Sequence, residues 1–198
     1  MRRIFAVLAA CWIGVVSADD NSVVVLMTDL GEITIEVFED RAPVSSGSFL
    51  AHVDTGSYDG AAFYRVVRPD NDNGEPVISV IQGGLLEGND TLPPVAHETT
   101  GETGVLHEDG VISLARAEPG TGSGAAFFIC IGAQPALDFG GTRNTDGQGF
   151  AAFGKVIGGM DVVHKIHQRE AQGPSESAYM KGQILTEFVS IRTAHRVQ

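Results

Sequence analysis

Short runs of β-branched and aromatic residues, separated by glycine-rich turns, recur along almost the whole chain and favour a fold built mainly of β-strands. In one run, Ile33, Ile35 and Val37 alternate with polar residues, which is the pattern of a strand with one buried face. The 25 glycines and eight prolines provide the turns between such runs. The sequence predicts eight strands, at residues 23–27, 33–37, 63–67, 77–82, 110–115, 127–131, 150–156 and 184–192.

Two helical segments interrupt the succession of strands. Pro43 can occupy the first turn of a helix, and apolar residues recur at helical spacing from there to Gly56. A second short helix is expected at 162–166, after the glycine pair 158–159. Strands joined by long glycine-rich loops, with helices at two separate points, favour a closed barrel capped by helices.

The N-terminus has the three parts of a secretory signal. Arg2 and Arg3 form a basic start, residues 4–16 are apolar, and small residues precede Asp19. The apolar stretch is shorter than the roughly 20 residues that span a bilayer, so stable membrane insertion is not expected. The sequence therefore predicts a signal peptide at 1–18 and a single domain at 19–198, exported to the periplasm.

An alternative destination follows from Cys11. The run Leu8-Ala9-Ala10-Cys11 is similar to the lipidation box of bacterial lipoproteins, in which the cysteine becomes the acylated first residue. Few apolar residues precede Cys11, and the apolar segment 12–16 after it is a poor lipoprotein linker. Secretion as a soluble protein is the favoured interpretation, and a lipid anchor through Cys11 is the alternative.

Charge and cysteine content restrict the partners and the chemistry. The formal net charge is -12, and loss of Arg2 and Arg3 would leave 11 basic against 25 acidic residues, a net charge of -14. Such a surface repels nucleic acid phosphates and anionic lipids, so neither is expected as a partner. Removal of the signal would leave only Cys130, which excludes an intramolecular disulfide. Cys130 lies in the apolar run FFICI, so we expect a buried thiol without a catalytic role.

Three short patterns suggest a bound ion or nucleotide, and none has the full set of residues. The glycine-rich segment 118–124 lacks the lysine of a phosphate-binding loop. The acidic segment 70–75 would place Val80 where a calcium loop needs a carboxylate. His164 and His167 have no evident third ligand. No metal and no cofactor are therefore expected.

Several short sequence motifs follow one another in a characteristic order along the chain. FYRVV, VIQGG, FFICIG, LDF and FGKVIGGMDVV follow the opening stretch VVLMTDLGEITIEVFEDRAPVSSGSFLAHVDTGSYDG. This order resembles the cyclophilins, the peptidyl-prolyl cis-trans isomerases, and in particular their exported bacterial branch. The resemblance extends over residues 23–191 and implies a closed eight-stranded antiparallel barrel capped by two short helices. It also implies a substrate groove on the outer face of the barrel.

Two polar residues carry the expected catalysis. Arg65 is surrounded by apolar residues in FYRVV, which is unusual unless its charged head has a task. The resemblance implies a catalytic role for Arg65, and it implies that Gln82 of VIQGG holds the arginine and the peptide backbone. Plainer interpretations are an ion pair between Arg65 and a carboxylate at the barrel rim, and a strand-end cap at Gln82.

Apolar residues are expected to bind the substrate. The resemblance implies that Phe128 and Leu137 line a proline pocket and that Ala115 accepts the residue preceding the proline. Phe150 stands where many members have histidine or tyrosine and is expected to refill part of the pocket. Phe63, on the strand of Arg65, is also assigned to substrate binding. The alternative for such residues is packing in the core.

The chain also departs from the family pattern around the pocket. The segment 68–78 carries about nine extra residues, and Ser79 and Val80 replace an aromatic residue and a methionine. Ala126 stands where a polar residue usually binds the substrate backbone, and Ala136 where many members have tryptophan or phenylalanine. These departures are expected to affect rate and affinity more than the location of the site.

Two function classes follow. The first is an enzyme that accelerates X-Pro isomerisation during the folding of exported proteins, a reaction that needs no nucleophile, metal or proton transfer. The second is a binding or chaperone module of the same fold that holds proline-containing segments with little or no turnover. In both cases the partners are proline-containing segments of unfolded or folding proteins, and nothing demands more than a monomer.

Overall fold

The alternation of residues 33–37 produces a strand with one face in the barrel interior. In β2 (Gly31–Val37), Ile33, Ile35 and Val37 are fully buried, whereas Thr34 is only partly covered. The structure, a computed structural model, describes residues 21–86 and 90–197. The other strands also contribute buried apolar residues to a common core.

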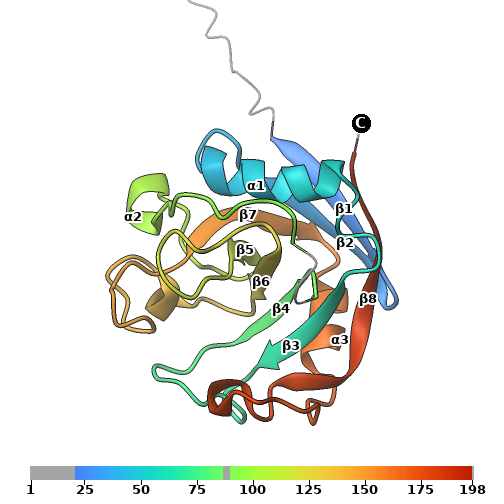
Figure 1. The fold of residues 1–198 in the computed structure, drawn as a ribbon, viewed down its shortest axis with the longest axis vertical. Helices are drawn as coiled ribbons and strands as arrows, with labels where there is room; N and C mark the ends of the chain where they lie inside the picture. Colours follow the sequence, from blue (N-terminus) through green and yellow to red (C-terminus); the bar gives the residue numbers. More distant parts are fainter. Residues whose placement is uncertain (1–20, 87–89, 198) are drawn as a thin grey trace, which may run out of the picture.

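Eight antiparallel strands close into a barrel in the order β1-β2-β7-β5-β6-β4-β3-β8 (Figure 1). The remaining strands are β1 (Ser22–Thr28), β3 (Ala62–Val67), β4 (Val80–Gly84), β5 (Val111–Leu114), β6 (Ala126–Cys130), β7 (Ala151–Gly158) and β8 (Ile184–Arg196). The predicted mainly β, eight-stranded barrel is confirmed. All eight predicted strands exist, with ends that differ by a few residues.

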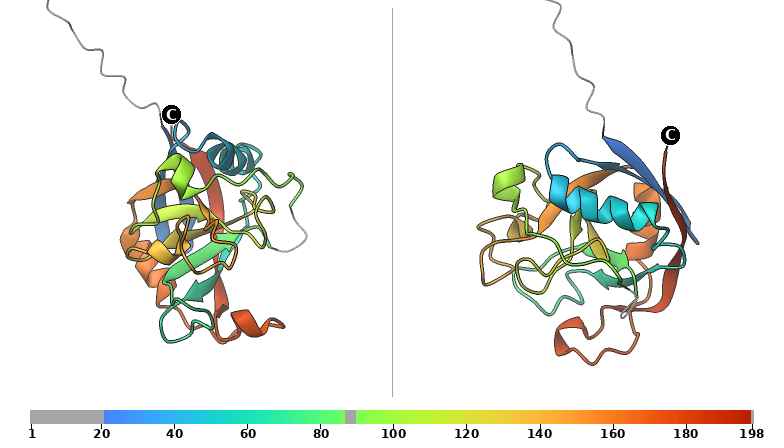
Figure 2. Two further views of the ribbon diagram at one scale, coloured as in Figure 1. Left: turned by 90° about the vertical axis from the view of Figure 1, so that its left-hand side faces the viewer. Right: turned by 45° about the horizontal axis from the view of Figure 1, so that its top comes forward.

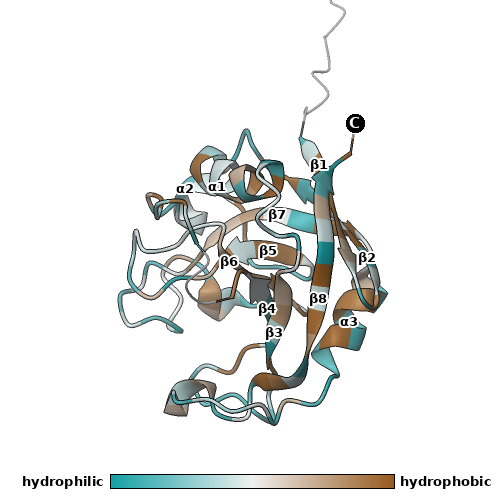
Figure 3. Ribbon diagram, turned by 45° about the vertical axis from the view of Figure 1, so that its right-hand side comes forward, coloured by the Kyte–Doolittle hydropathy of each residue, from teal (hydrophilic) through white to brown (hydrophobic). Residues whose placement is uncertain are grey.

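Two helices close the interior of the barrel. Phe49 and Leu50 of α1 (Pro43–Asp54) and Val163 and Ile166 of α3 (Met160–His167) belong to the same buried cluster as the strands. Figure 1 and Figure 2 place α1 and α3 on different sides of the barrel. In Figure 3 the long loops at the left of the view are mostly hydrophilic.

Shorter helical pieces lie in the connecting loops. They are α2 (Thr100–Thr103) and the 3-10 turns η1 (Pro135–Leu137) and η2 (Ala178–Met180). α2 was not predicted from the sequence, although Thr99 and Glu102 form a complete capping box at its start. η1 places Leu137 and η2 places Tyr179 beside the site described below.

β4 begins at Val80, three residues later than predicted, because the preceding residues bond to side chains. The backbone N–H of Ile78 donates to Asp72 Oδ2 at 2.9 Å, and that of Ser79 donates to Gln134 Oε1 at 3.2 Å. The segment 68–78 folds back toward residues 178–183, and Figure 1 shows both at the lower end of the molecule.

Several expectations concern other parts of the chain. The predicted signal peptide at 1–18, with Cys11, lies outside the described residues. Within 21–86 and 90–197, no helix combines the length and hydrophobicity that crossing a membrane requires. Cys130 is fully buried, as expected, and burial raises the pKa of its thiol.

Candidate active site

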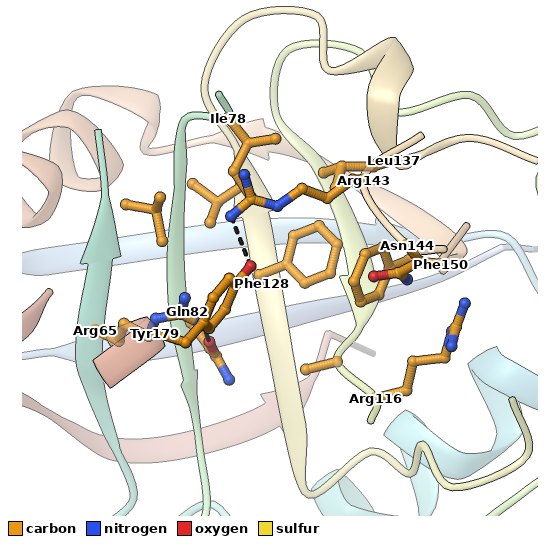
Figure 4. Close-up of a pocket in the computed structure, with 13 residues that line it drawn as sticks. Arg65, Ile78, Gln82, Arg116, Phe128, Leu137, Arg143, Asn144, Phe150 and Tyr179 are labelled. Atoms are coloured by element: carbon orange, nitrogen blue, oxygen red, sulfur yellow. Dashed lines mark hydrogen bonds between the residues drawn. The ribbon is translucent and has the colours of Figure 1, made fainter. Parts of the chain in front are cut away.

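A pocket of about 200 Å³ opens on the outer face of the barrel, across β3, β4 and β6 (Figure 4). Six of the seven residues expected to form a site line it: Arg65, Gln82, Ala115, Phe128, Leu137 and Phe150. They come from separate parts of the sequence, and the closure of the barrel brings them together.

A β-bulge in β3 directs Arg65 into this pocket. The pairing of β3 with β4 and with β8 shifts between Phe63 and Arg65, so one extra residue is inserted there. Phe63 and Val66 consequently both face the barrel interior and are fully buried, whereas Arg65 points outward and pairs in register with Gln82. Simple alternation would have placed Phe63 and Arg65 on the same face.

The assignment of Phe63 to substrate binding is therefore wrong. Its ring packs edge-on against Phe127, with ring centres 5.8 Å apart, inside the barrel core. No part of Phe63 is exposed. Its neighbour across the sheet, Gly83, accommodates this ring, because a Cβ there would lie 2.7 Å from it.

Two glutamines hold the guanidinium of Arg65. Nη1 donates to Gln82 Oε1 at 2.8 Å, and Nε and Nη2 both donate to Gln183 Oε1, at 2.9 and 2.6 Å. Gln82 is fixed in turn, since its Nε2 donates to the hydroxyl of Tyr64 at 3.0 Å. Sequence reasoning identified Gln82 but missed Gln183, which carries no local signal and is 118 positions away from Arg65.

Arg65 is held by amides and not by a carboxylate. None of the ion pairs among the described residues includes it, so the interpretation of Arg65 as one half of a rim ion pair is wrong. Burial lowers the pKa of Arg65, but arginine remains charged at physiological pH. Of its five N–H bonds, three donate to the two glutamines, and within 21–86 and 90–197 two remain for a ligand.

An apolar floor lies beside this cation. Phe128 is 6% exposed, and its ring packs edge-on against Phe150, with ring centres 5.2 Å apart. Leu137, from η1, and Ala115, just after β5, pack into the same cluster. The cluster lies outside the barrel interior and is separate from the main core. Its position supports the prediction that these residues contact a substrate.

A buried polar network supports Phe128 from behind. The imidazole of His107 stacks on Phe128, with ring centres 5.8 Å apart, while its Nδ1 lies 2.8 Å from Asp138 Oδ1 and its Nε2 lies 3.0 Å from Ser113 Oγ. This arrangement is similar to that of serine hydrolases. Ser113 is fully buried, however, so its hydroxyl cannot reach a substrate and the network is structural.

Two further arginines line the pocket, and both are paired with carboxylates. Arg116 donates to both oxygens of Asp146, at 2.8 and 2.9 Å. Arg143 donates to both oxygens of Asp72, at 2.8 and 2.7 Å, and their side chains are 2% and 0% exposed. Arg65 thus differs from its two neighbours in having its charge available for a ligand.

Comparisons with known proteins show what the chain is similar to. Residues 23–193 match the family model described as "Cyclophilin type peptidyl-prolyl cis-trans isomerase/CLD". The chain is 34% identical over 170 residues to a peptidyl-prolyl cis-trans isomerase of Acinetobacter baylyi, covering 84% of this chain and 82% of that protein. It is 33% identical over 143 residues to peptidyl-prolyl cis-trans isomerase B of Escherichia coli, covering 70% and 80%.

A solved structure shares the fold. A cyclophilin type peptidyl-prolyl cis-trans isomerase of Cryptosporidium parvum superposes with a TM-score of 0.65, at 20% identity, over 90% of this chain and 98% of that one. A further crystal structure of that isomerase, in the presence of the dipeptide ala-pro, gives a TM-score of 0.64. At this identity the likeness concerns the fold alone.

Proposed function

The chain belongs to the cyclophilin family of peptidyl-prolyl cis-trans isomerases, and on this premise we propose that it accelerates X-Pro isomerisation in exported proteins as they fold. Arg65 and Gln82 are the proposed catalytic residues. The observation that carries the assignment concerns Arg65, at the edge of an apolar pocket. Among the described residues, the hydrogen bonds of its guanidinium all go to glutamine amides, which leaves two N–H bonds for a ligand.

The reaction requires stabilisation of a twisted amide. Rotation about a peptide bond meets a barrier of about 18–20 kcal/mol, because the nitrogen lone pair is delocalised into the carbonyl. When the amide is twisted, the lone pair becomes localised on nitrogen and can accept a hydrogen bond. A donor that meets this lone pair stabilises the transition state more than either planar isomer, which is the condition for catalysis.

Arg65 is suited to be that donor. The hydrogen bonds to Gln82 and Gln183 fix the guanidinium before a substrate arrives, so no reorganisation is needed during the rotation. A preorganised donor in a dry site contributes about 3–4 kcal/mol, or roughly two to three decades of rate. Lysine cannot replace the planar fork of donors, even though it carries the same charge.

The apolar cluster supplies the rest of the proposed site. Phe128, Leu137 and Phe150 would enclose the prolyl ring, and Ala115 would accept the residue before it. The volume of about 200 Å³ is below the roughly 300–1,000 Å³ of pockets that enclose whole drug-sized ligands. It suits one ring of a peptide that otherwise lies across the surface.

Exchange NMR on an X-Pro peptide tests the catalytic assignment. We expect Arg65→Ala and Arg65→Lys each to lower kcat/KM by roughly a hundredfold or more. Arg192→Ala provides a matched control, because Arg192 is an exposed arginine whose side chain pairs with Asp29. Equal rates in wild type and both Arg65 variants would reject the catalytic role.

The alternative is a binding module of the same fold with little turnover. The small residues Ser79, Ala126 and Ala136 favour it, because they remove contacts that the family pattern provides. The same experiment separates the two functions. A module that only binds would shift peptide resonances with a measurable Kd while leaving the rate of cis-trans exchange unchanged.

Export is proposed from the sequence pattern at 1–18. N-terminal sequencing of the protein recovered from cells is the direct test. A mature end at Asp19 would agree with a soluble periplasmic isomerase. An acylated Cys11 would place the protein on a membrane surface, and an intact Met1 would contradict export.

A further inference from the structure

Tyr179, which no sequence signal identified, forms one side of the pocket. It belongs to η2, just before β8, and its side chain remains about half exposed. The guanidinium carbons of Arg65 and Arg143 lie over its ring, 5.4 and 5.5 Å from the ring centre. Figure 4 shows the ring at the pocket, next to Gln82. An aromatic side chain therefore covers part of the catalytic cation.

The position of this ring is fixed at both ends. Arg143 Nη2 donates to the Tyr179 hydroxyl at 2.6 Å. Asn73 Nδ2 donates to the backbone carbonyls of Tyr179 and Lys181, at 3.1 and 2.8 Å. A half-exposed tyrosine on a loop would ordinarily sample several rotamers. These bonds hold the ring in one place over the pocket.

The inserted segment 68–78 is the anchor for this arrangement. It contributes Asn73, and its Asp72 accepts two of the hydrogen bonds that orient Arg143. Gly74 lies against the same guanidinium, since a Cβ there would be 2.6 Å from Arg143 Cζ. The insertion thus fixes the side chain of Arg143, and Arg143 in turn fixes the ring of Tyr179.

The strand order places Tyr179 opposite Ala115. From one edge of the pocket to the other, Ala115 follows β5, Phe128 lies on β6, Gln82 on β4 and Arg65 on β3. Tyr179 lies in the segment that leads into β8, which is the next strand in that order. A peptide that crosses the pocket with one neighbour of its proline at Ala115 directs the other neighbour toward Tyr179.

We infer that Tyr179 is a specificity-determining residue that contacts the substrate residue following the proline and favours an aromatic or large apolar side chain there. This inference rests on the proposed function, because it takes the residue before the proline to lie at Ala115. Ser79, just before β4, and Val80, at its start, are smaller than the aromatic residue and methionine of the family pattern. The ring of Tyr179 provides an aromatic wall of the pocket in their place. Packing of two aromatic rings is worth about threefold to tenfold in kcat/KM.

The test uses peptides Ala-Ala-Pro-Z-Ala in which Z is Phe, Leu, Ala or Gly, with exchange NMR for kcat/KM and resonance shifts for Kd. In wild type we expect the Phe peptide to exceed the Gly peptide by about threefold to tenfold. Tyr179→Phe keeps this preference, and Tyr179→Ala removes it, so that the Phe and Gly peptides have similar kcat/KM values in that variant. Phe139→Ala is the matched control, since Phe139 is an exposed aromatic residue that does not line the pocket.

Two results would overturn the inference: no preference for Z in wild type, or a preference that persists in Tyr179→Ala. Thermal denaturation of each variant confirms that it is folded. Arg65→Ala, measured on the same peptides, separates this inference from the proposed function. If it retained wild-type rates, the catalytic assignment would fail, whereas the Kd values would still show whether Tyr179 selects residue Z.

Discussion

Gln183 Oε1 accepts hydrogen bonds from both Nε and Nη2 of Arg65, at 2.9 and 2.6 Å. Its Nε2 donates to the backbone carbonyl of Asn71 at 2.9 Å, and the side chain is fully buried. The side-chain amide of Gln183 therefore links Nε and Nη2 of Arg65 to the inserted segment 68–78. The other end of the guanidinium is left to Gln82 and to a ligand.

Replacement of Gln183 by leucine should lower kcat with little change in KM. The substitution removes the one oxygen that accepts two hydrogen bonds from the guanidinium but leaves the apolar pocket intact. A hydrogen bond to a charged group contributes about 1.5–3 kcal/mol, and the two bonds that share this acceptor are taken together at that value. We expect a loss of roughly tenfold to a hundredfold in kcat on an X-Pro peptide, measured by exchange NMR. Gln168→Leu, at an exposed glutamine, is the control. A rise in KM at constant kcat would contradict a positioning role.

Substitution of Phe63 should affect mainly stability, and substitution of Phe128 should affect mainly activity. Phe63→Leu changes the barrel interior, so it should lower the free energy of unfolding by about 1 kcal/mol while kcat/KM of the folded protein is unchanged. Phe128→Leu thins the pocket floor and should lower kcat/KM by roughly threefold to tenfold. Denaturant unfolding and exchange NMR measure the two effects. An equal loss of kcat/KM in both variants would show that Phe63 does reach the substrate.

Two glycine substitutions should have opposite effects on stability. At Gly74 a Cβ would lie 2.6 Å from Arg143 Cζ, so Gly74→Ala must displace a buried ion pair and should cost about 1–3 kcal/mol. Gly47 lies inside α1 with nothing within 4 Å of such a Cβ, so Gly47→Ala should add about 0.5–1 kcal/mol. Urea unfolding measures both. A neutral Gly74→Ala would mean that Arg143 is not confined there.

The pair Asp72 and Arg143 should make stability depend on pH in the acidic range. Although burial alone would raise it, hydrogen bonds from Arg143 and from backbone N–H groups hold the pKa of Asp72 below its ordinary value. Because the pKa is lower in the folded state, this contribution is complete above the unfolded pKa of about 3.9 and is lost as the pH falls below it.

Asp72→Asn tests this dependence. At pH 7 it leaves a buried arginine without its counter-ion and should cost about 3–5 kcal/mol. The difference in unfolding free energy between wild type and variant should shrink as the pH falls from 5 toward 2. Asp161→Asn, which removes an exposed pair with Lys165, is the control and should have little effect. A difference that is constant with pH would contradict the ionic contribution of Asp72.

The strands were predictable because their signal is local. Alternating residues and glycine turns indicate each strand independently, and the order of phrases around Arg65 and Gln82 located the pocket. The bulge in β3 was not predictable from alternation, since one extra residue reverses the facing of Phe63 relative to Arg65. The error at Phe63 has this single cause.

The residues around Tyr179 and Gln183 were missed for a different reason. They lie in irregular segments that carry no periodic pattern, and their partners are far away in sequence. Arg143 and Asp72 are 71 positions apart, and Asn73 and Tyr179 are 106 apart. A pattern confined to neighbouring residues contains no information about such pairs, although the length of the 68–78 insertion indicated that something had been added beside the pocket.

The bulge in β3 also separates two kinds of change that mutation can make in this molecule. Phe63 and Val66 pack in the barrel interior, so their side chains affect stability. Arg65 lies between them in sequence but faces outward, so its side chain affects the binding and turnover of peptides. Substitutions at the inward positions change the free energy of unfolding, and substitutions at the outward position change kcat/KM. Evolution can therefore change the stability of a barrel with this bulge without changing its catalytic residue.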